Sequence, residues 1–584
     1  MGLMWEPMSF STSVQLRRNP GLAALLLCLC AAPATSRETI DLSLKSESGV
    51  DARCAFVRTF EEDSWSSPEG IARILSFSSG KGMFYPTAHL ASYYADLPAL
   101  VEALFADPSP GAKQMAAATV AFAQLGDYLE REKQAALSRE GNGEAGSSES
   151  AEGGEKAPAK KAKRVKKGAA SKVLAKLFED KSAATLELAV LAAAYAGDAS
   201  VRALVEAAPA KAGSGMTGAK LLYHARLGDP LDAAQVAAAF ALSANAAEHL
   251  TTAGPMLANF NLLQPREAYA CEALGIAKAE GQLDPLCRML VHPDIRVQIE
   301  AIRALRKIGS REALPRLLKR LDTREWPVLA ELCLALAALP AKESVAPLIA
   351  RLKRETGRLR LDVNYALSCI AGDQIADSPA EWQAWWNKAS GKFQVDEERT
   401  RSFRGSHRIQ DMRVPVLGEF YGLPICSDHF AYVVDSSNSM KGAKMENLRS
   451  NLKDSINGLA PGVCFGIVDF GGTVESMNQN RLTDSKRTGL DRLQKIRLSQ
   501  GTRLYDALEQ AAWMEGVDTL FVLTDGAPVK GQLNRWPQLY RAIALMNRYR
   551  PLAMHTVAFE ARTANQQSLR EMAGQTYGLT IEVN

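Results

Sequence analysis

The sequence predicts a multidomain fold in which an α-helical solenoid precedes a doubly wound α/β domain. Three observations carry this prediction. Amphipathic helical units that begin near a proline recur between residues 281 and 372. Over residues 429–584, short apolar runs alternate with amphipathic stretches, which is typical of a mostly parallel sheet with helices on both faces. A polar, charged stretch at residues 139–171 divides the helical part, and 584 residues are enough for several domains.

Residues 1–36 are predicted to be a secretory signal peptide. Arg17 and Arg18 supply positive charge, residues 21–32 form a short apolar core, and Ala34-Thr35-Ser36 offers a small-residue cleavage site. The apolar core is too short to span a bilayer comfortably, and no other stretch is long and apolar enough to do so. We therefore expect a secreted, periplasmic or cell-envelope protein. An uncleaved anchor is the alternative.

The next two regions show no recognisable chemistry. Residues 37–138 are predicted to be a helical N-terminal region, because residues 97–105 and 114–125 have apolar side chains at helical spacing. Residues 139–171 are rich first in Gly, Ser and Glu and then in Ala, Pro and Lys, so we expect a disordered charged linker. We favour a solvated linker whose acidic and basic halves attract each other. Contact of its lysines with an anionic surface is the alternative.

Residues 172–390 are predicted to form helical repeats. Three similar segments, at residues 283–290, 313–321 and 345–352, place a proline in the first helical turn, where its missing N–H costs nothing. An amphipathic helix lies between successive segments. These units resemble HEAT repeats of the short bacterial type, most clearly over residues 281–372. The resemblance implies helix pairs that stack into a curved solenoid.

Two further assignments complete the helical part. Trp382, Trp385 and Trp386 have the spacing of one helix face, and we interpret them as the cap that closes the solenoid rather than as a binding surface. Residues 391–428 are polar and are predicted to be a connector. The cysteines beyond the signal are far apart and include no Cys-x-x-Cys pair, so the sequence predicts neither a zinc site nor a disulfide framework.

The last domain, residues 429–584, is predicted to alternate strands and helices. Ligands of open α/β sheets bind at the carboxyl ends of strands, so polar residues just after a strand are the candidate site. Strands are expected at residues 430–434, 463–468, 473–477, 519–523, 551–559 and 579–583, and helices at residues 443–458, 484–498, 503–514, 535–549 and 564–576.

Oxygen-bearing side chains follow two of these strands and one loop. Asp435, Ser437 and Ser439 come directly after the first strand. Thr502 lies at a loop-to-helix turn, and Asp525 ends another buried strand. Hard oxygen donors of this kind suit Mg²⁺. In order and spacing, the five residues resemble the metal-ion-dependent adhesion site of von Willebrand factor A domains.

This resemblance implies a function in binding. In that family the two Ser and the Thr bind the metal directly, the two Asp act directly or through water, and an acidic side chain of a partner completes the shell. It implies here a site for Mg²⁺, or Mn²⁺ or Ca²⁺, and a protein partner that supplies an Asp or Glu. Asn438 stands where Gly is common, which puts the loop conformation in question. Because this loop lies at the edge of the sheet, Asp435→Ala is expected to leave the fold largely intact.

Binding is a better interpretation than catalysis. The seven His are scattered, and His555, inside a strand, is expected to be a satisfied core residue. Residues 213–220 imitate a phosphate-binding loop, but Ala219 displaces the Lys from its Gly. A net charge of +4 argues against a dedicated nucleic-acid binder. We expect a non-enzymatic, adhesion-type interaction protein. The alternatives are a structural component of an envelope assembly with a fold-stabilising or vestigial metal site, and a regulatory subunit of an intracellular chelatase or ATPase machine.

Overall fold

The computed structural model describes residue 57 and residues 65–78, 84–109, 111–141, 167–210, 214–240 and 264–583. The expected signal peptide and the middle of the expected linker lie outside the described residues. The chain divides into two compact units. Residues 1–123, 166–189 and 253–260 form the smaller unit, and the remaining residues form the larger one. Among the helices that are described, none is both long and apolar enough to cross a membrane.

The smaller unit is helical, as the sequence predicted. Asp96 caps α5 by accepting a 3.0 Å hydrogen bond from the backbone N–H of Ala99. Helix α6 ends at Gly141 and α7 begins at Lys167, so both extend into the ends of the linker expected at residues 139–171. The helices are α3 (Pro68–Ser78), α4 (Phe84–Tyr94), α5 (Leu97–Ala106), the start of α6 (Ala112–Gly141), α7 (Lys167–Leu177) and the start of α8 (Ala183–Ala196).

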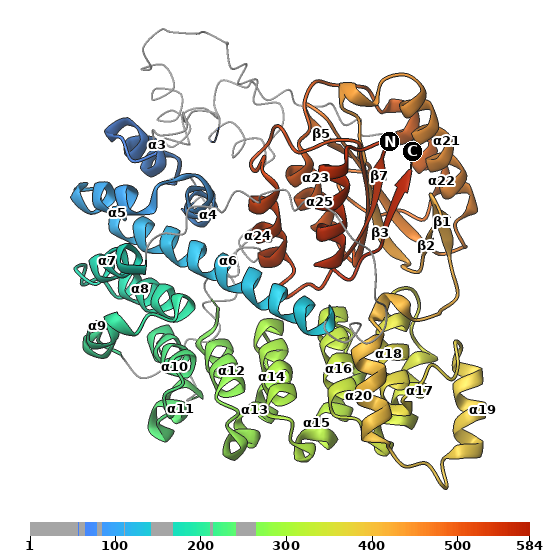
Figure 1. The fold of residues 1–584 in the computed structure, drawn as a ribbon, viewed down its shortest axis with the longest axis horizontal. Coiled ribbons are helices and arrows are strands. Elements are labelled where there is room, and N and C mark those ends of the chain that lie inside the picture. Colours follow the sequence, from blue (N-terminus) through green and yellow to red (C-terminus); the bar gives the residue numbers. More distant parts are fainter. Residues whose placement is uncertain are drawn as a thin grey trace, which may run out of the picture. The chain divides into compact units, whose positions relative to one another are not determined.

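The larger unit begins with stacked helices. Helices α12, α14, α16 and α18 pack on one another in turn (Figure 1). Gly275 lets α12 approach α14 closely, since a Cβ there would lie 2.7 Å from the Cα of Ala304. Residues 215–220, from the segment that imitates a phosphate-binding loop, form the start of helix α10. The helices are α9 (Arg202–Ala207), α10 (Gly215–Leu227), α11 (Ala233–Phe240), α12 (Arg266–Ile276), α13 (Leu283–Met289), α14 (Ile295–Ile308), α15 (Leu314–Lys319), α16 (Trp326–Ala338), α17 (Val345–Leu352) and α18 (Leu359–Ala371).

Of the three tryptophans, Trp382 belongs to the core of the last repeat. Trp382 on α19 (Pro379–Ala389) is fully buried, and its indole donates a 2.6 Å hydrogen bond to Asn364 of α18. Trp385 and Trp386 are half-buried and pack against Phe393. This arrangement agrees with a packing role for the aromatic stripe.

The connector expected at residues 391–428 contains regular structure, which corrects the sequence prediction. It holds helix α20 (Glu397–Ser406) and a hairpin of two strands, β1 (Gly418–Phe420) and β2 (Leu423–Ile425). Helix α20 buries only Thr400 and Phe403. The helix therefore lacks a repeated apolar face, and strands of three residues are too short to show an alternating pattern.

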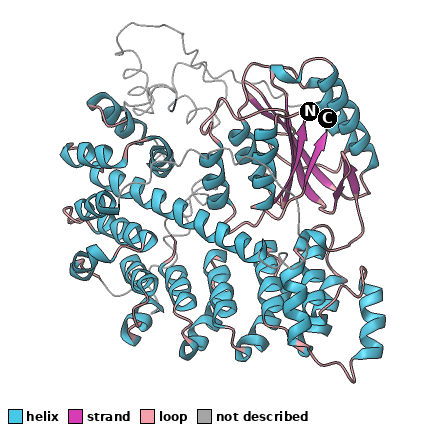
Figure 2. Cartoon of the chain, in the orientation of Figure 1, coloured by secondary structure: helices cyan, strands magenta, loops and turns pink. Residues whose placement is uncertain are grey.

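A six-stranded sheet forms the second half of the larger unit, as predicted. Strand β5 is antiparallel to β4, and the other pairs are parallel. Helices α21 (Ala443–Gly458) and α22 (Lys486–Lys495) cover one face, and α23 (Leu504–Ala512), α24 (Trp536–Met546) and α25 (Thr563–Gly574) cover the other (Figures 1 and 2). The strands are β3 (His429–Asp435), β4 (Cys464–Phe470), β5 (Val474–Ser476), β6 (Thr519–Thr524), β7 (Ala553–Phe559) and β8 (Thr580–Val583), in the spatial order β5-β4-β3-β6-β7-β8.

The apolar runs of the strands form the core of this domain. Phe430 and Tyr432 of β3 and Phe521 of β6 are fully buried and pack in one cluster with Leu448 and Leu452 of α21. The rings of Phe430 and Phe521 meet edge to face, with centroids 5.3 Å apart. Strand β3 lies between β4 and β6 and is covered on both faces, which explains its unbroken apolar sequence.

Buried ion pairs attach the sheet to the repeats within the larger unit. Arg548, in the turn between α24 and β7, lies 2.9 Å from Glu272 of α12. Its neighbour Tyr549 donates a 2.8 Å hydrogen bond to Glu300 of α14. Arg303 of α14 donates one of the same length to the carbonyl of Arg548. Charges this deeply buried are stabilised only while their partners remain in place.

Arg548→Leu is therefore expected to destabilise the larger unit by about 3 kcal/mol or more, since Glu272 would lose a buried cationic partner. The urea midpoint of the full chain measures this loss. Arg354→Leu is the matched control, because Arg354 pairs with Asp322 at 2.6 Å and both side chains are exposed. Such pairs contribute about 0–1 kcal/mol. Equal midpoints for the two variants would contradict the role of the buried pairs.

Candidate functional site

The sheet brings the predicted oxygen donors to its carboxyl edge. Strand β3 pairs in parallel with β6 in a register that ends both strands at the same level. Asp435 is the last residue of β3, and Asp525 directly follows β6. After β3 the chain turns at once into the short helix η8 (Asn438–Met440), so Ser437 and Ser439 stay at this edge.

Asp435 ends its strand at the carboxyl edge of the sheet but is fully buried, so the expectation that Asp435→Ala leaves the fold largely intact does not follow from its position at this edge. One carboxylate oxygen accepts a 2.8 Å hydrogen bond from the backbone N–H of Ser437. The other accepts a 2.6 Å hydrogen bond from the hydroxyl of Thr524. Burial raises the pKa of Asp435 to about 6, although both hydrogen bonds act in the opposite direction. The residue therefore supports the fold as well as the site.

The hydroxyls of two serines connect the end of β3 to the carboxylate of Asp525. The hydroxyls of Ser437 and Ser439 lie 2.8 Å apart, and Ser439 donates a 2.8 Å hydrogen bond to Asp525. Ser439 is exposed, whereas Asp525 is nearly buried. Together with Asp435, four of the five predicted residues thus meet. Their oxygens are hard donors of the kind that small divalent cations prefer.

Thr502, the fifth predicted residue, reaches this edge through its loop. Ser499 in the same loop pairs with Ser437, and its N–H donates a 2.9 Å hydrogen bond to the carbonyl of Ser436. Gly471 permits this approach, because a Cβ there would lie 2.3 Å from the Ser499 hydroxyl. The Thr502 side chain is buried, and no described hydrogen bond joins it to the other four predicted residues; only its loop reaches the site, through Ser499.

Asn438 does not disturb the loop. It begins η8, and its φ is not positive. The left-handed position falls instead on Gly442, with φ +80°, immediately before α21. The departure from Gly at position 438 therefore causes no backbone strain.

A lysine that the sequence did not indicate as part of the site lies beside the carboxylate of Asp525. The Nζ of Lys444 is 2.9 Å from Asp525 and 3.5 Å from Glu560. Burial disfavours the ammonium, but the two carboxylates outweigh it and raise the pKa of Lys444. Lys444, Glu560 and Thr524 were all missed from the sequence. Thr524 could have been noted as the residue before Asp525, but the other two become neighbours only through folding.

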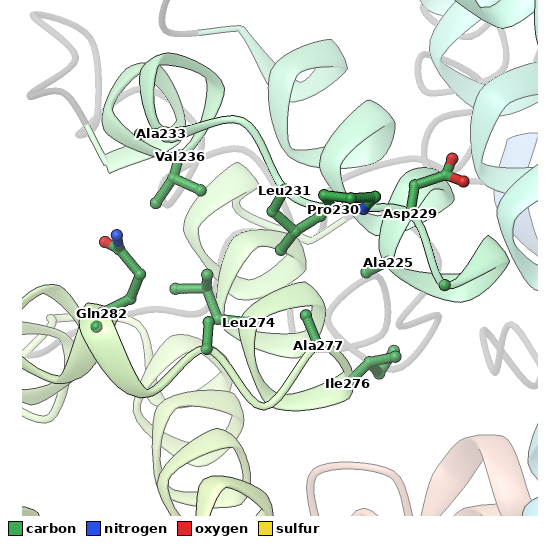
Figure 3. Close-up of a pocket in the computed structure, with 13 residues that line it drawn as sticks. Ala225, Asp229, Pro230, Leu231, Ala233, Val236, Leu274, Ile276, Ala277 and Gln282 are labelled. Atoms are coloured by element: carbon green, nitrogen blue, oxygen red, sulfur yellow. The ribbon is translucent and has the colours of Figure 1, made fainter.

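Other polar groups do not form an alternative site. Within the described ranges, no cluster of three or more His, Cys, Asp or Glu side chains could hold a metal. His555 accepts a hydrogen bond from the backbone of Leu579, and burial lowers its pKa to about 4, as expected of a core histidine. A pocket of about 550 Å³ among the repeats is lined by Asp229 and Gln282, among others (Figure 3). Asp229 is the acidic side chain that lines this pocket, and it already forms an ion pair with Arg202.

Two parts of the chain match known families. Residues 430–527 match the von Willebrand factor type A domain, and residues 266–336 match HEAT repeats. The repeats precede the α/β domain, as the sequence predicted, and both are generally non-catalytic interaction modules. A stretch of 127 residues is 25% identical to the inter alpha-trypsin inhibitor, heavy chain 4, of Mus musculus. The match covers 19% of this chain and spans 14% of that protein.

Asp435→Ala is expected to lower the free energy of unfolding by about 1–3 kcal/mol at pH 5, because the Thr524 hydroxyl and the Ser437 N–H lose their buried acceptor. The loss should shrink at pH 7.5. A pKa raised from 3.8 to about 6 in the fold means that the wild-type chain itself loses stability as pH rises through that range.

Denaturation in metal-free buffer, followed by circular dichroism, measures this effect. Ser439→Ala is the control. Its side chain is exposed, so the free energy of unfolding should change by no more than about 0.5 kcal/mol at either pH. If Asp435→Ala and the wild-type chain have the same denaturation midpoint at pH 5, the hydrogen bonds of Asp435 do not support the fold.

Proposed function

We propose that this chain is a non-enzymatic, adhesion-type interaction protein. Its von Willebrand factor A domain would bind a divalent metal ion and, through it, an acidic side chain of a protein partner. The observation that carries the proposal is the connected set of Asp435, Ser437, Ser439 and Asp525 at the carboxyl edge of the sheet. The HEAT repeats would serve as its scaffold.

The donor set fits a hard divalent cation. Two carboxylates and two serine hydroxyls supply only oxygen, and Thr502 would add a third hydroxyl, which suits Mg²⁺, or Mn²⁺ or Ca²⁺. The region already attracts positive charge, since the ammonium of Lys444 lies beside Asp525. The residues that would hold the ion are Asp435, Ser437, Ser439, Thr502 and Asp525.

The charge of the site favours a carboxylate as the ligand. Asp435 and Asp525 supply at most two negative charges, and Lys444 offsets one of them. Because Glu560 balances Lys444, a bound divalent ion would offset the two site carboxylates, and an incoming carboxylate would meet a centre without net negative charge. Mg²⁺ gives up its last waters reluctantly, and hard anions displace them best. An Asp or Glu side chain of a partner meets both conditions.

Catalysis and an intracellular role receive less support. Lys444, the basic group beside the donors, is held protonated by Asp525 and Glu560, so it is a poor general base. The signal-like composition of residues 1–36 supports secretion, or retention in the periplasm or cell envelope. The same segment argues against a subunit of an intracellular chelatase or ATPase machine.

A structural component of an envelope assembly is the second candidate. The ion pair between Lys444 and Asp525 favours it, because an internal ammonium would satisfy that carboxylate without any metal. In this case the site would be vestigial or would only stabilise the fold.

The wild-type chain is expected to bind one Mn²⁺ per molecule. Ser439→Ala and Thr502→Ala should each weaken this binding by about tenfold or more, since each removes a hydroxyl donor. The electron paramagnetic resonance signal of free Mn²⁺ measures the affinity. Ser450→Ala, an exposed serine on α21, is the matched control and should bind as wild type does. Wild-type affinity in both site variants would contradict the assignment.

Partner capture separates the two candidate functions. If the metal links the partner, chelation releases proteins captured by the immobilised full-length chain, and Mg²⁺ restores their binding. The structural alternative predicts instead that chelation lowers thermal stability and leaves capture unchanged.

Lys444→Met is expected to raise the affinity for Mn²⁺ by roughly three- to tenfold, because it removes a partly exposed positive charge that competes for Asp525. Titration calorimetry measures the change. Lys453→Met is the control, since Lys453 is exposed on the same helix. A weaker affinity in Lys444→Met would show that the lysine supports the metal site rather than opposing it.

A further inference from the structure

Two exposed apolar side chains flank the candidate metal site. Leu498 is 37% exposed and Val529 is 59% exposed. Leu498 directly precedes Ser499, the residue that pairs with Ser437. The backbone N–H of Val529 donates a 3.2 Å hydrogen bond to the carbonyl of Thr502. Single exposed apolar residues are ordinary on protein surfaces, so the evidence is their shared position beside the metal-site loops.

Each apolar residue has a cationic neighbour in the sequence. Arg497 precedes Leu498, and Lys530 follows Val529. Both cations are exposed, and both donate hydrogen bonds to backbone carbonyls. In the described structure neither forms an ion pair with a carboxylate, so the protein itself does not neutralise their charge. We call Arg497, Leu498, Val529 and Lys530 the rim.

The other loops at this edge add positive charge. Lys441 follows η8, Arg535 precedes α24, and Arg562 precedes α25, and all three are exposed. The exposed acidic residues near this edge are Glu560, beside which Lys444 lies, Glu475 of β5, which pairs with Arg492, and Glu446 in the first turn of α21. In the described structure, exposed cations at this edge outnumber exposed acids, and two apolar side chains lie among them.

We propose that the rim binds an extended acidic segment of a partner protein, in which the metal-binding Asp or Glu lies between large apolar side chains and further acidic ones. This inference rests on the proposed function and adds the chemistry of the partner around its metal-binding carboxylate. Burial of Leu498 and Val529 would contribute affinity. Arg497 and Lys530 would attract the segment and orient it.

Two occupants from this same chain fit the rim less well. Residues 140–155 are acidic, but their other members are Gly, Ser, Ala and Asn, so they offer no large side chain to cover Leu498 and Val529. A second copy would place one rim against another across a two-fold axis. Like charges would then face each other, which opposes association.

Peptide selection tests the chemistry of the partner. The full-length chain, in Mg²⁺, is used to select from a displayed library with a fixed central aspartate and four varied positions on each side. We expect enrichment of Leu, Ile, Val or Phe next to the aspartate and of Asp or Glu beyond them. Failure to enrich these residues overturns the proposal. So does a synthetic peptide of residues 140–155 that binds as tightly as the selected ones.

Variants of the rim separate its role from that of the metal. Val529→Ser should weaken binding of the best selected peptide by about tenfold, measured by fluorescence anisotropy. Lys530→Glu should have a similar effect at low ionic strength and a smaller one at high ionic strength. Val529→Ser should keep the Mn²⁺ affinity of the wild-type chain, because it changes neither a charge nor a proposed ligand, whereas Lys530→Glu, which adds negative charge beside the site, should not weaken Mn²⁺ binding.

Val416→Ser is the matched control. Val416 is 57% exposed. Its neighbour Leu417 bonds to Ala460, in the turn before β4, which places it at the amino edge of the sheet. If Val529→Ser leaves the peptide affinity unchanged, or if Val416→Ser lowers it equally, the proposed role of the rim is overturned. Absence of Mn²⁺ binding by the wild-type chain would instead overturn the proposed function.

Discussion

Everything at the carboxyl edge of the sheet follows from the parallel pairing of β3 with β4 and β6. Because these strands run in one direction, the loops that follow them meet. Asp435 and Thr524 are 89 residues apart in the sequence, yet a 2.6 Å hydrogen bond joins them. The aromatic core holds this register, since a shift of one residue would turn Phe430 and Phe521 away from it. Core packing therefore places the site.

The opposite edge of the sheet contacts the repeats through buried charged and polar groups. Arg548 and Tyr549 lie in the turn before β7 and reach Glu272 and Glu300 of the repeats. The repeats thus support the amino edge, and the metal-site loops lie at the other end of the strands. A partner can reach those loops without separating the sheet from its support, which suits an interaction module carried on a scaffold.

Charge at the site changes sign from the interior to the surface. Asp435 is buried and Asp525 is nearly so, Lys444 pairs with Asp525, and exposed cations such as Lys530 lie outside them. The proposed metal ion would occupy the acidic interior, whereas an acidic partner would meet the basic surface. One arrangement of charge thus gives a physical reason for both proposed ligands, and the exposed Val529 adds an apolar contact to the second.

Local patterns were enough to predict the order of the repeats and the α/β domain and the elements of residues 429–584. They also indicated five candidate donors, four of which the structure brings together. The period of apolar residues reports a helix or strand directly, and a donor's position just after a strand is a local property. Helix α20 was not predicted because it buries only Thr400 and Phe403, and the β1–β2 hairpin was not predicted because strands of three residues are too short to show a repeat. Lys444 and Glu560 were not predicted as neighbours of the site for a different reason. Their roles depend on distances across the fold, as does the burial of Asp435, and such distances arise only when the strands pair and the core closes.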